Sequence, residues 1–202
     1  MKIDFHQLKN ENTLPRYYIN LSIDYKKDTP IVTRFKVQAP IIHVIEKGRK
    51  KTYFISDKLE TKNSVVKKIL NDQSINIKNI QKQIEGRFLV ISFQGNSIAI
   101  FSDKLGRTDL FYKNSKKNFM CSILLDDFEK GKYDDQLSLM NFFMLYGSRA
   151  PRNRTLFSEI KRLGVGETLN VGKGISIDQY YPRLKKYRNH NQNKYNELFL
   201  NA

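Results

Sequence analysis

The stretch GRFLVISFQGNSIAIFSDKLGRTDLFYK, from Gly86 to Lys113, decides the fold. Nearly every position from 88 to 93 is apolar, which indicates a strand buried on both faces. Gly95-Asn96 then predicts a tight reversal, because both residues tolerate a positive φ, and a second strand follows over 97–101. A polar turn that ends at Gly106 leads into a third strand over 109–113. We therefore expect three antiparallel strands in the middle of one buried sheet.

On the N-terminal side of this stretch, the first quarter of the chain alternates apolar and polar residues in short segments. This period-two pattern is typical of half-buried strands, here separated by turns and joined as an antiparallel meander. Two further strands are predicted near the C-terminal end, on either side of the turn Gly172-Lys173-Gly174. The predicted outer strands cover residues 17–25, 31–38, 41–46, 52–56, 167–171 and 175–180.

Helical spacing of apolar residues appears in three places. Residues 59–70 predict one helix, with Thr61, Asn63 or Ser64 as N-cap, and residues 77–84 predict a shorter one. Gly86 is expected to end the shorter helix as a C′ glycine. A third helix is predicted over 134–145, and a short helical turn within 121–130. These elements place the chain in the α+β class, with two antiparallel sheets and a few helices.

The order of motifs resembles the class II glutamine amidotransferase domains at the front of asparagine synthetases. Residues 103–112 (DKLGRTDLFY) are similar to the family's D-x-x-G-x-x-P-L-Y-Y stretch, and Gly86-Arg87-Phe88 to its G-x-F. Tyr146-Gly147, Thr155 and residues 160–167 (IKRLGVGE), followed by Tyr180-Tyr181, resemble its later Y-G…T…I-x-x-L-x-P-G…Y run. Asp109 and Val165 stand where the family usually has Pro.

The resemblance implies an αββα sandwich of the N-terminal nucleophile hydrolase type, two antiparallel sheets flanked by helices. It assigns residues 1–184 to a glutaminase-like domain. Residues 185–202 would be a basic linker and the start of a helix leading to a synthetase-like domain. The motif positions expected to have structural roles are Gly86, Phe88, Asp103, Gly106, Arg107, Tyr112, Thr155, Gly166 and Tyr180.

The residues that such enzymes need for glutamine hydrolysis are missing. The family uses an N-terminal cysteine whose own amino group is the base. Here Met1 is followed by Lys2, which is too large for easy removal of Met1, and the nearest hydroxyl, Thr13, would require cleavage after Asn12. The glutamine-holding N-G-E-I-Y-N motif is also absent. We therefore expect no glutaminase activity and no catalytic residue in this chain.

Other residue types give no second catalytic or metal-binding pattern. Cys121 is the single cysteine and is expected to be a buried core residue. His6, His43 and His190 are scattered, without the spacing of a metal site. The acidic pairs 126–127 and 134–135 fall near helix starts, where carboxylates cap helices. No bound cofactor is expected, and ATP with Mg would belong to the synthetase-like domain.

The net charge of +16 is the largest compositional bias. Residues 149–188 contain ten basic and three acidic residues, a net +7, which is under half of the total. The rest is spread along the chain, and no motif for stacking bases is present, which argues against nucleic acid as the partner. A candidate surface for a partner domain or an acidic substrate comprises Arg149, Arg152, Arg154, Lys161 and Arg162.

Three functions remain open from the sequence. The chain is expected to be the inactive, structural or substrate-guiding half of an ATP-dependent ligase that forms amide bonds, on a peptide or a small molecule. The alternatives are a stand-alone interaction module and, less favoured, a basic nucleic-acid-binding protein. No apolar run approaches the ~20 residues of a membrane span. The first residues also lack the apolar core of a signal peptide. The expected location is therefore the cytoplasm.

Overall fold

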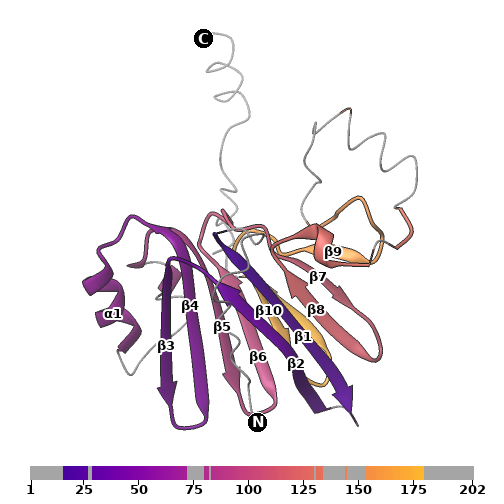
Figure 1. Ribbon diagram of the computed structural model, residues 1–202, viewed down its shortest axis with the longest axis horizontal. Coiled ribbons are helices and arrows are strands. Elements are labelled where there is room, and N and C mark those ends of the chain that lie inside the picture. The colour runs from indigo at the N-terminus through magenta and orange to yellow at the C-terminus, as the bar shows by residue number, and fades with distance from the viewer. Residues whose placement is uncertain are drawn as a thin grey trace, which may run out of the picture.

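The computed structural model describes residues 16–26, 29–71, 80–81, 83–129, 131–133, 144 and 153–179. These residues form two antiparallel sheets that lie face to face (Figure 1). Strands make up 56% of the structure described and helices 12%, so the described part of the chain is mostly β.

The smaller sheet has five strands in the spatial order β2-β1-β8-β7-β9. The first strand of the chain therefore pairs with the eighth, with Asn20 opposite Ser122 and Asp24 opposite Asn118. Its strands are β1 (Tyr18–Lys26), β2 (Thr29–Gln38), β7 (Phe111–Asn114), β8 (Asn118–Ser122) and β9 (Ile160–Arg162).

The larger sheet has six strands in the order β11-β10-β6-β5-β4-β3. The hairpin of β5 and β6 forms its centre, with β4 on one side and β10 on the other. Its strands are β3 (Ile41–Lys47), β4 (Lys50–Leu59), β5 (Gly86–Gln94), β6 (Ser97–Ser102), β10 (Glu167–Val171) and β11 (Ile175–Gln179).

The main core fills the space between the two sheets. Leu21 and Cys121 come from the smaller sheet and Leu89, Ile91 and Ile100 from the larger one, and each of these side chains is fully buried. An aromatic group joins the layers, since the ring centroid of Phe35 lies 5.0 Å from that of Tyr53 and 5.6 Å from that of Phe93, in edge-to-face geometry. Such aromatic pairs add about 0.5–1.5 kcal/mol beyond the area that they bury.

A second core lies on the outer face of the larger sheet, under the helix α1 (Asn63–Asn71). Val66 and Leu70, four residues apart, occupy one side of this helix and are fully buried. They pack on Phe54 and Phe88, whose rings stack with centroids 5.0 Å apart. The alternate residues of β5 thus serve both cores, as the apolar stretch 88–93 predicted.

The outer face of the smaller sheet is covered by a small apolar cluster instead of an α-helix. Phe128, Phe157 and Ile160 form a small cluster there, next to the short 3-10 helix Leu125–Asp127. Cys121 belongs to β8 rather than to a helical turn, so the turn predicted within 121–130 is confined to the 3-10 segment.

The expectation of an αββα sandwich flanked by helices is wrong for the described part of the chain, which contains a single α-helix on one face of one sheet. Of the helix predicted over 77–84, residues 80, 81 and 83 are helical, with the Ile84 N–H donating to Ile80 at 3.0 Å. The helix predicted over 134–145 lies outside the described residues, apart from Met144. No helix in the part described is long and apolar enough to cross a membrane.

Three local expectations also need correction. The third strand of the opening stretch, β7, joins the smaller sheet, because the turn after β6 carries the chain from one layer to the other. The N-terminal strands likewise form two hairpins in different sheets rather than one meander, with the change of sheet at Ala39-Pro40. Gly86 begins β5 with φ of 134° and does not cap a helix. The hairpin of β10 and β11 is confirmed.

Buried tyrosines predict how stability depends on alkaline pH. Burial raises the pKa of Tyr18 to about 12, and burial is also the main cause of the raised pKa of Tyr17 and Tyr53. In the unfolded chain these phenols ionise near pH 10. The unfolded state therefore loses these protons first, so that the contribution of the tyrosines to the free energy of unfolding is constant below about pH 10 and falls between about pH 10 and 12.

This dependence is measured by denaturant unfolding at a series of pH values, with tyrosinate absorbance recorded in parallel. We expect the fall in stability and the late part of the tyrosinate signal to coincide. The variant Tyr18→Phe should show a shallower fall. A free energy of unfolding that stays flat from pH 10 to 12 would contradict the burial of these phenols.

Candidate functional site

A tight turn after β6 gathers several motif residues at one end of the sandwich. The Asp103 carboxylate, 2% exposed, accepts the backbone N–H groups of Leu105 and Arg107, both at 3.0 Å. Burial raises the pKa of Asp103, while these N–H groups and the Arg107 guanidinium oppose the rise. Asp103 also pairs with Arg107, whose Nε lies 3.9 Å from Oδ1. Asp103 therefore stabilises the turn that connects the two sheets.

This turn contacts the second half of the resemblance. A Cβ on Gly106 would lie 2.8 Å from Cγ2 of Val165, and Gly106 itself has φ of 60°. Gly166, next to Val165, has φ of 70°. The two motif segments are thus packed together, and glycine is required at position 106 by both the backbone angle and the lack of space.

The segment before β9 is held by its own side chains. Thr155, 7% exposed, donates through Oγ1 to the carbonyl of Ile160 at 2.7 Å and accepts the N–H of Phe157 at 3.1 Å. Asn153 donates to both carboxylate oxygens of Glu167, at 3.1 and 3.2 Å. These contacts fix the loop that leads into β9.

A polar cluster lies near the same end, where β1 begins. The Arg87 guanidinium is 5.3 Å from the centre of the Tyr17 ring and forms an ion pair with Asp57, Nη1 to Oδ2, at 3.3 Å. Among the residues that the structure describes, no hydrogen-bond partner is present for four buried atoms: the hydroxyls of Tyr17 and Thr108, Oδ1 of Asp57 and Nε of Arg87. Burial is the largest influence on the pKa of Tyr17 and raises it, while the neighbouring Thr108 hydroxyl acts in the opposite direction. Tyr17 therefore stays protonated and cannot act as a base at neutral pH.

Cys121 and His43, two residues considered above as reactive groups, both lie in structural positions. Cys121 is fully buried and its pKa is raised by burial, so the thiolate is strongly disfavoured. His43 lies on the edge strand β3, where it stacks on Phe54 and forms a hydrogen bond with Asn63 at 2.7 Å. Among the residues described, no group of three or more His, Cys, Asp or Glu side chains is placed to hold a metal ion.

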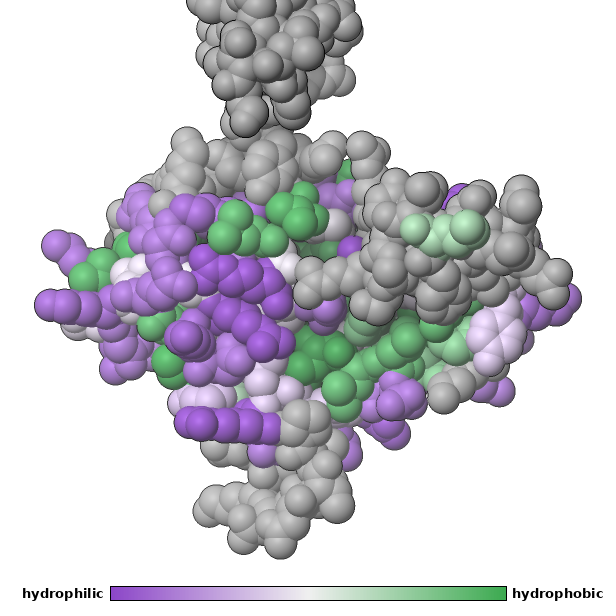
Figure 2. Space-filling model, turned by 90° about the horizontal axis from the view of Figure 1, so that it is seen from above, coloured by the Kyte–Doolittle hydropathy of each residue, from purple (hydrophilic) through white to green (hydrophobic). Residues whose placement is uncertain are grey.

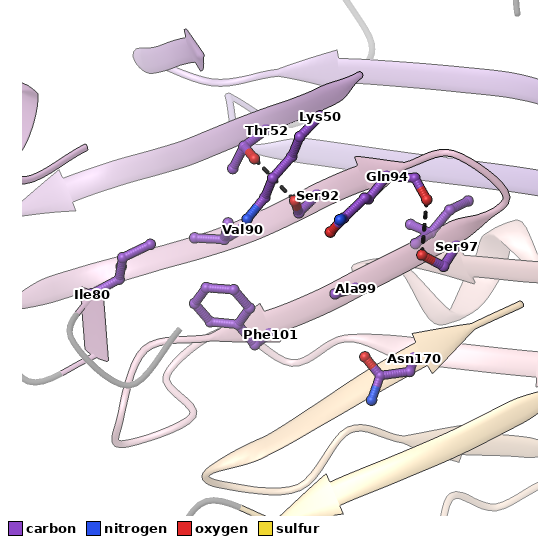
Figure 3. A pocket seen from close by; sticks show the side chains of 11 residues that line it. Lys50, Thr52, Ile80, Val90, Ser92, Gln94, Ser97, Ala99, Phe101 and Asn170 are labelled. Atoms are coloured by element: carbon purple, nitrogen blue, oxygen red, sulfur yellow. Dashed lines mark hydrogen bonds between the residues drawn. The ribbon is translucent and has the colours of Figure 1, made fainter. Parts of the chain in front are cut away.

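One hollow, of about 140 Å³, lies on the outer face of the larger sheet (Figure 3). Thr52 and Ser92 share a buried hydrogen bond of 2.9 Å on its floor, and Gln94 accepts a bond from Ser97 at 2.9 Å. Lys50 lies along one side and Phe101 on the other. The hydroxyls of Thr52 and Ser92 thus satisfy each other, whereas the side chains of Lys50 and Gln94 line the hollow without a bond to either.

A larger hollow, of about 370 Å³, lies at the edge of the smaller sheet beside β9. Of the candidate partner surface, it brings together Arg154 and Lys161. Arg162 is on the other face of β9 and pairs with Asp109 at 3.3 Å. Arg149, Arg152 and the motif residue Tyr180 lie outside the described residues. The hollow is lined by Tyr112, Asn153, Arg154, Thr155, Phe157, Ser158, Ile160, Lys161 and Ile177.

At the end of the sandwich that carries the Asp103 turn, hydrophilic and apolar residues occupy separate parts of the surface. In the view from above, hydrophilic side chains gather on the side of α1, and apolar ones are grouped next to them (Figure 2). Leu105 and Val165, which flank the Gly106 contact, are 53% and 46% exposed. Ion pairs neutralise nearby charges, including those of Lys104 with Glu85 and Arg107 with Glu60.

Sequence reasoning found the motif turn but missed the cluster around Tyr17. Its polar groups come from the residue before β1, from β4, from β5 and from the turn after β6, which are distant in sequence. The one signal available was a charged residue, Asp57 or Arg87, beside an otherwise apolar strand. The sequence matches no protein-family model and, in a search of curated proteins, no significant relative.

Proposed function

We propose that the chain is the inactive, glutaminase-like part of an asparagine synthetase-related, ATP-dependent ligase that forms amide bonds. In this role it is structural and guides a peptide or small-molecule substrate. The observation that carries the proposal is the contact of the DKLG turn with Val165. Two segments that resemble one family, about sixty positions apart, pack on each other as parts of one unit.

Two of the described side chains are held in their neutral forms. Burial in the core raises the pKa of Cys121 and keeps its thiol protonated, and burial likewise keeps the Tyr17 hydroxyl protonated. ATP and Mg are assigned to a synthetase-like domain, in the same polypeptide or a separate one, and the location proposed is the cytoplasm. The basic residues of the surface fit a partner or substrate with acidic groups.

Capture of the endogenous chain from its own cells by antibody, followed by intact mass spectrometry, tests the proposal. We expect either a mass well above 23.8 kDa or a separate co-purifying ATP-using protein. In both cases the eluate should consume ATP only when a carboxylic acid and an amine are supplied, and should release no ammonia from glutamine. A mass near 23.8 kDa with no ATP consumption would overturn the ligase and leave the interaction module.

A variant series locates the contact with the synthetase-like part. Changing Arg149, Arg152 and Arg154 together to alanine should weaken the association by at least about tenfold, since charge-assisted contacts contribute roughly 1.5–3 kcal/mol each. Lys173→Ala, in the exposed hairpin between β10 and β11, is the matched control. Unchanged association in the triple variant would remove this surface from the proposal. Retention on nucleic acid that weakens steeply with salt would favour the basic nucleic-acid binder instead.

A further inference from the structure

The hairpins of the described strands all turn at the same end of the sandwich, opposite the end that carries the Asp103 turn (Figure 1). Strand register brings the turns of each sheet together. In the smaller sheet, the Tyr25 N–H donates to the carbonyl of Lys117 at 2.8 Å, so the β1–β2 turn lies against the β7–β8 turn. In the larger sheet, Lys50 pairs with Gln94, which aligns the β3–β4 turn with the β5–β6 turn. The turns are residues 26–29, 47–50, 94–97, 114–118 and 171–175.

Basic residues dominate these turns. The described part of the turns contains no acidic residue, and the closest ones in sequence are Asp24 and Glu46, of which Glu46 is paired with Lys51 at 2.5 Å. Six basic side chains, here named the hairpin rim, have no hydrogen bond or ion pair within the part of the chain that the structure describes, and all but the half-buried Lys50 are exposed. The hairpin rim consists of Lys26, Arg49, Lys50, Lys116, Lys117 and Lys173.

The opposite end of the sandwich is different, because its charges are paired. There Lys104 forms an ion pair with Glu85, and Arg107 with Glu60. The members of the hairpin rim lie far apart in sequence, so the amino-acid order alone shows only an even spread of charge. The topology gathers these cations at one end of the molecule and leaves them without a counter-charge among the described residues.

The position of the hairpin rim favours a broad anionic surface as its partner. Stacked sheets lie about 10 Å apart, so turns from two sheets present a patch of cations instead of a single line. A small anion in a hollow would reach few of them, and Lys50 is the one rim residue that lines either of the two hollows described above. Most of the rim is lysine, a compact point charge suited to phosphate groups. The described turn residues include no aromatic side chain on which a nucleic-acid base could stack.

We infer that the hairpin rim binds the anionic surface of a lipid bilayer. Its side chains lie among the phosphate groups, and none enters the hydrocarbon. Clusters of about four to eight Lys or Arg bind anionic leaflets in this way, and each one near the surface strengthens binding about fivefold. The Asp103 turn then points away from the bilayer and stays accessible to a partner. This inference goes beyond the proposed function and does not rest on it.

Sedimentation of the full 202-residue chain with lipid vesicles tests the inference. The probes are vesicles of phosphatidylcholine alone and vesicles that also contain about 30% phosphatidylserine, which is anionic. At about 0.05 M salt we expect the chain to sediment with the anionic vesicles and not with the neutral ones. Binding should be lost at about 0.5 M salt, because the charges are then screened within a few ångströms.

Two triple variants with the same net charge separate the rim from the overall charge of the protein. The rim variant should bind the anionic vesicles at least about tenfold more weakly, whereas the control should lose less than about threefold. All six side chains are exposed, so both variants are expected to fold. The rim variant combines Arg49→Gln, Lys116→Gln and Lys117→Gln, and the control, in and just before α1, combines Lys62→Gln, Lys67→Gln and Lys68→Gln.

Three results would overturn the inference. The first is no sedimentation with either kind of vesicle at low salt. The second is equal weakening by both triple variants, which would show that only the overall charge matters. The third is tighter binding to a short DNA duplex than to the anionic vesicles at equal phosphate concentration, weakened by the same rim variant, because the rim would then serve a nucleic acid. The ligase test is separate, since it measures ATP consumption and not binding to lipid.

Discussion

Phe88→Ala is expected to remove about 3–5 kcal/mol from the free energy of unfolding, the usual effect of truncating a fully buried phenylalanine. The side chain of Phe88 is 0% exposed and stacks on Phe54 under α1. Since single domains are stable by only about 5–15 kcal/mol, much of the folded population would be lost. Because α1 packs mainly on this cluster, its helical signal should fall together with the sheets.

Urea unfolding followed by circular dichroism measures this effect. Leu105→Ala provides the control, because Leu105 is 53% exposed and its truncation should cost less than about 0.5 kcal/mol. A loss below about 1 kcal/mol for Phe88→Ala would mean that the layer of α1 on the larger sheet is not well packed.

Gly86→Ala is expected to be the most damaging change of a single methyl group. With φ of 134°, the added Cβ would lie 2.7 Å from both Cα of Leu59 and the carbonyl oxygen of Lys58. Both are backbone atoms, so neither can rotate away, and β4 and β5 would have to separate locally. Backbone strain of this kind costs about 1–3 kcal/mol even without a collision, so we expect a total loss of about 3 kcal/mol or more.

Gly48→Ala separates the two causes. Gly48 also has a positive φ, of 57°, but nothing lies within 4 Å of the position of its Cβ. It should therefore lose only the roughly 1–2 kcal/mol of the left-handed conformation. Thermal unfolding of both variants gives the comparison, and equal losses would show that the approach of β4 to β5 is not tight at Gly86.

The strands were predictable because alternation of apolar residues is a local property. The apolar run 88–93 correctly indicated burial on both faces, and β10 and β11 were found from the Gly172–Gly174 turn. Assignment of strands to sheets was not predictable from alternation. A strand such as β7 has the same pattern in either layer, and its place is set by the Asp103 turn.

The candidate site was accessible to sequence reasoning only in part. Arg154 and Lys161 were selected for their charge, but so was Arg162, which the strand period places on the opposite face and which Asp109 neutralises. That separation depends on the register of β9 against β7, a tertiary contact. The cluster of Tyr17, Asp57 and Arg87 depends on three separate parts of the chain and left no local pattern.

The pairing of β1 with β8 has a consequence for how the chain folds. β1 pairs with β8, for example at Asn20 and Ser122, which are about a hundred residues apart in sequence. The larger sheet is complete only when β10 has also paired with β6. Proteins dominated by such distant contacts fold slowly, on the order of milliseconds to seconds, because chain entropy is lost before the contacts form. During synthesis, the hairpin of β1 and β2 emerges first and exposes Leu21 and Phe35 until β8 and the larger sheet arrive. The newly made chain is thus most prone to aggregation while the apolar face of the β1–β2 hairpin is still uncovered.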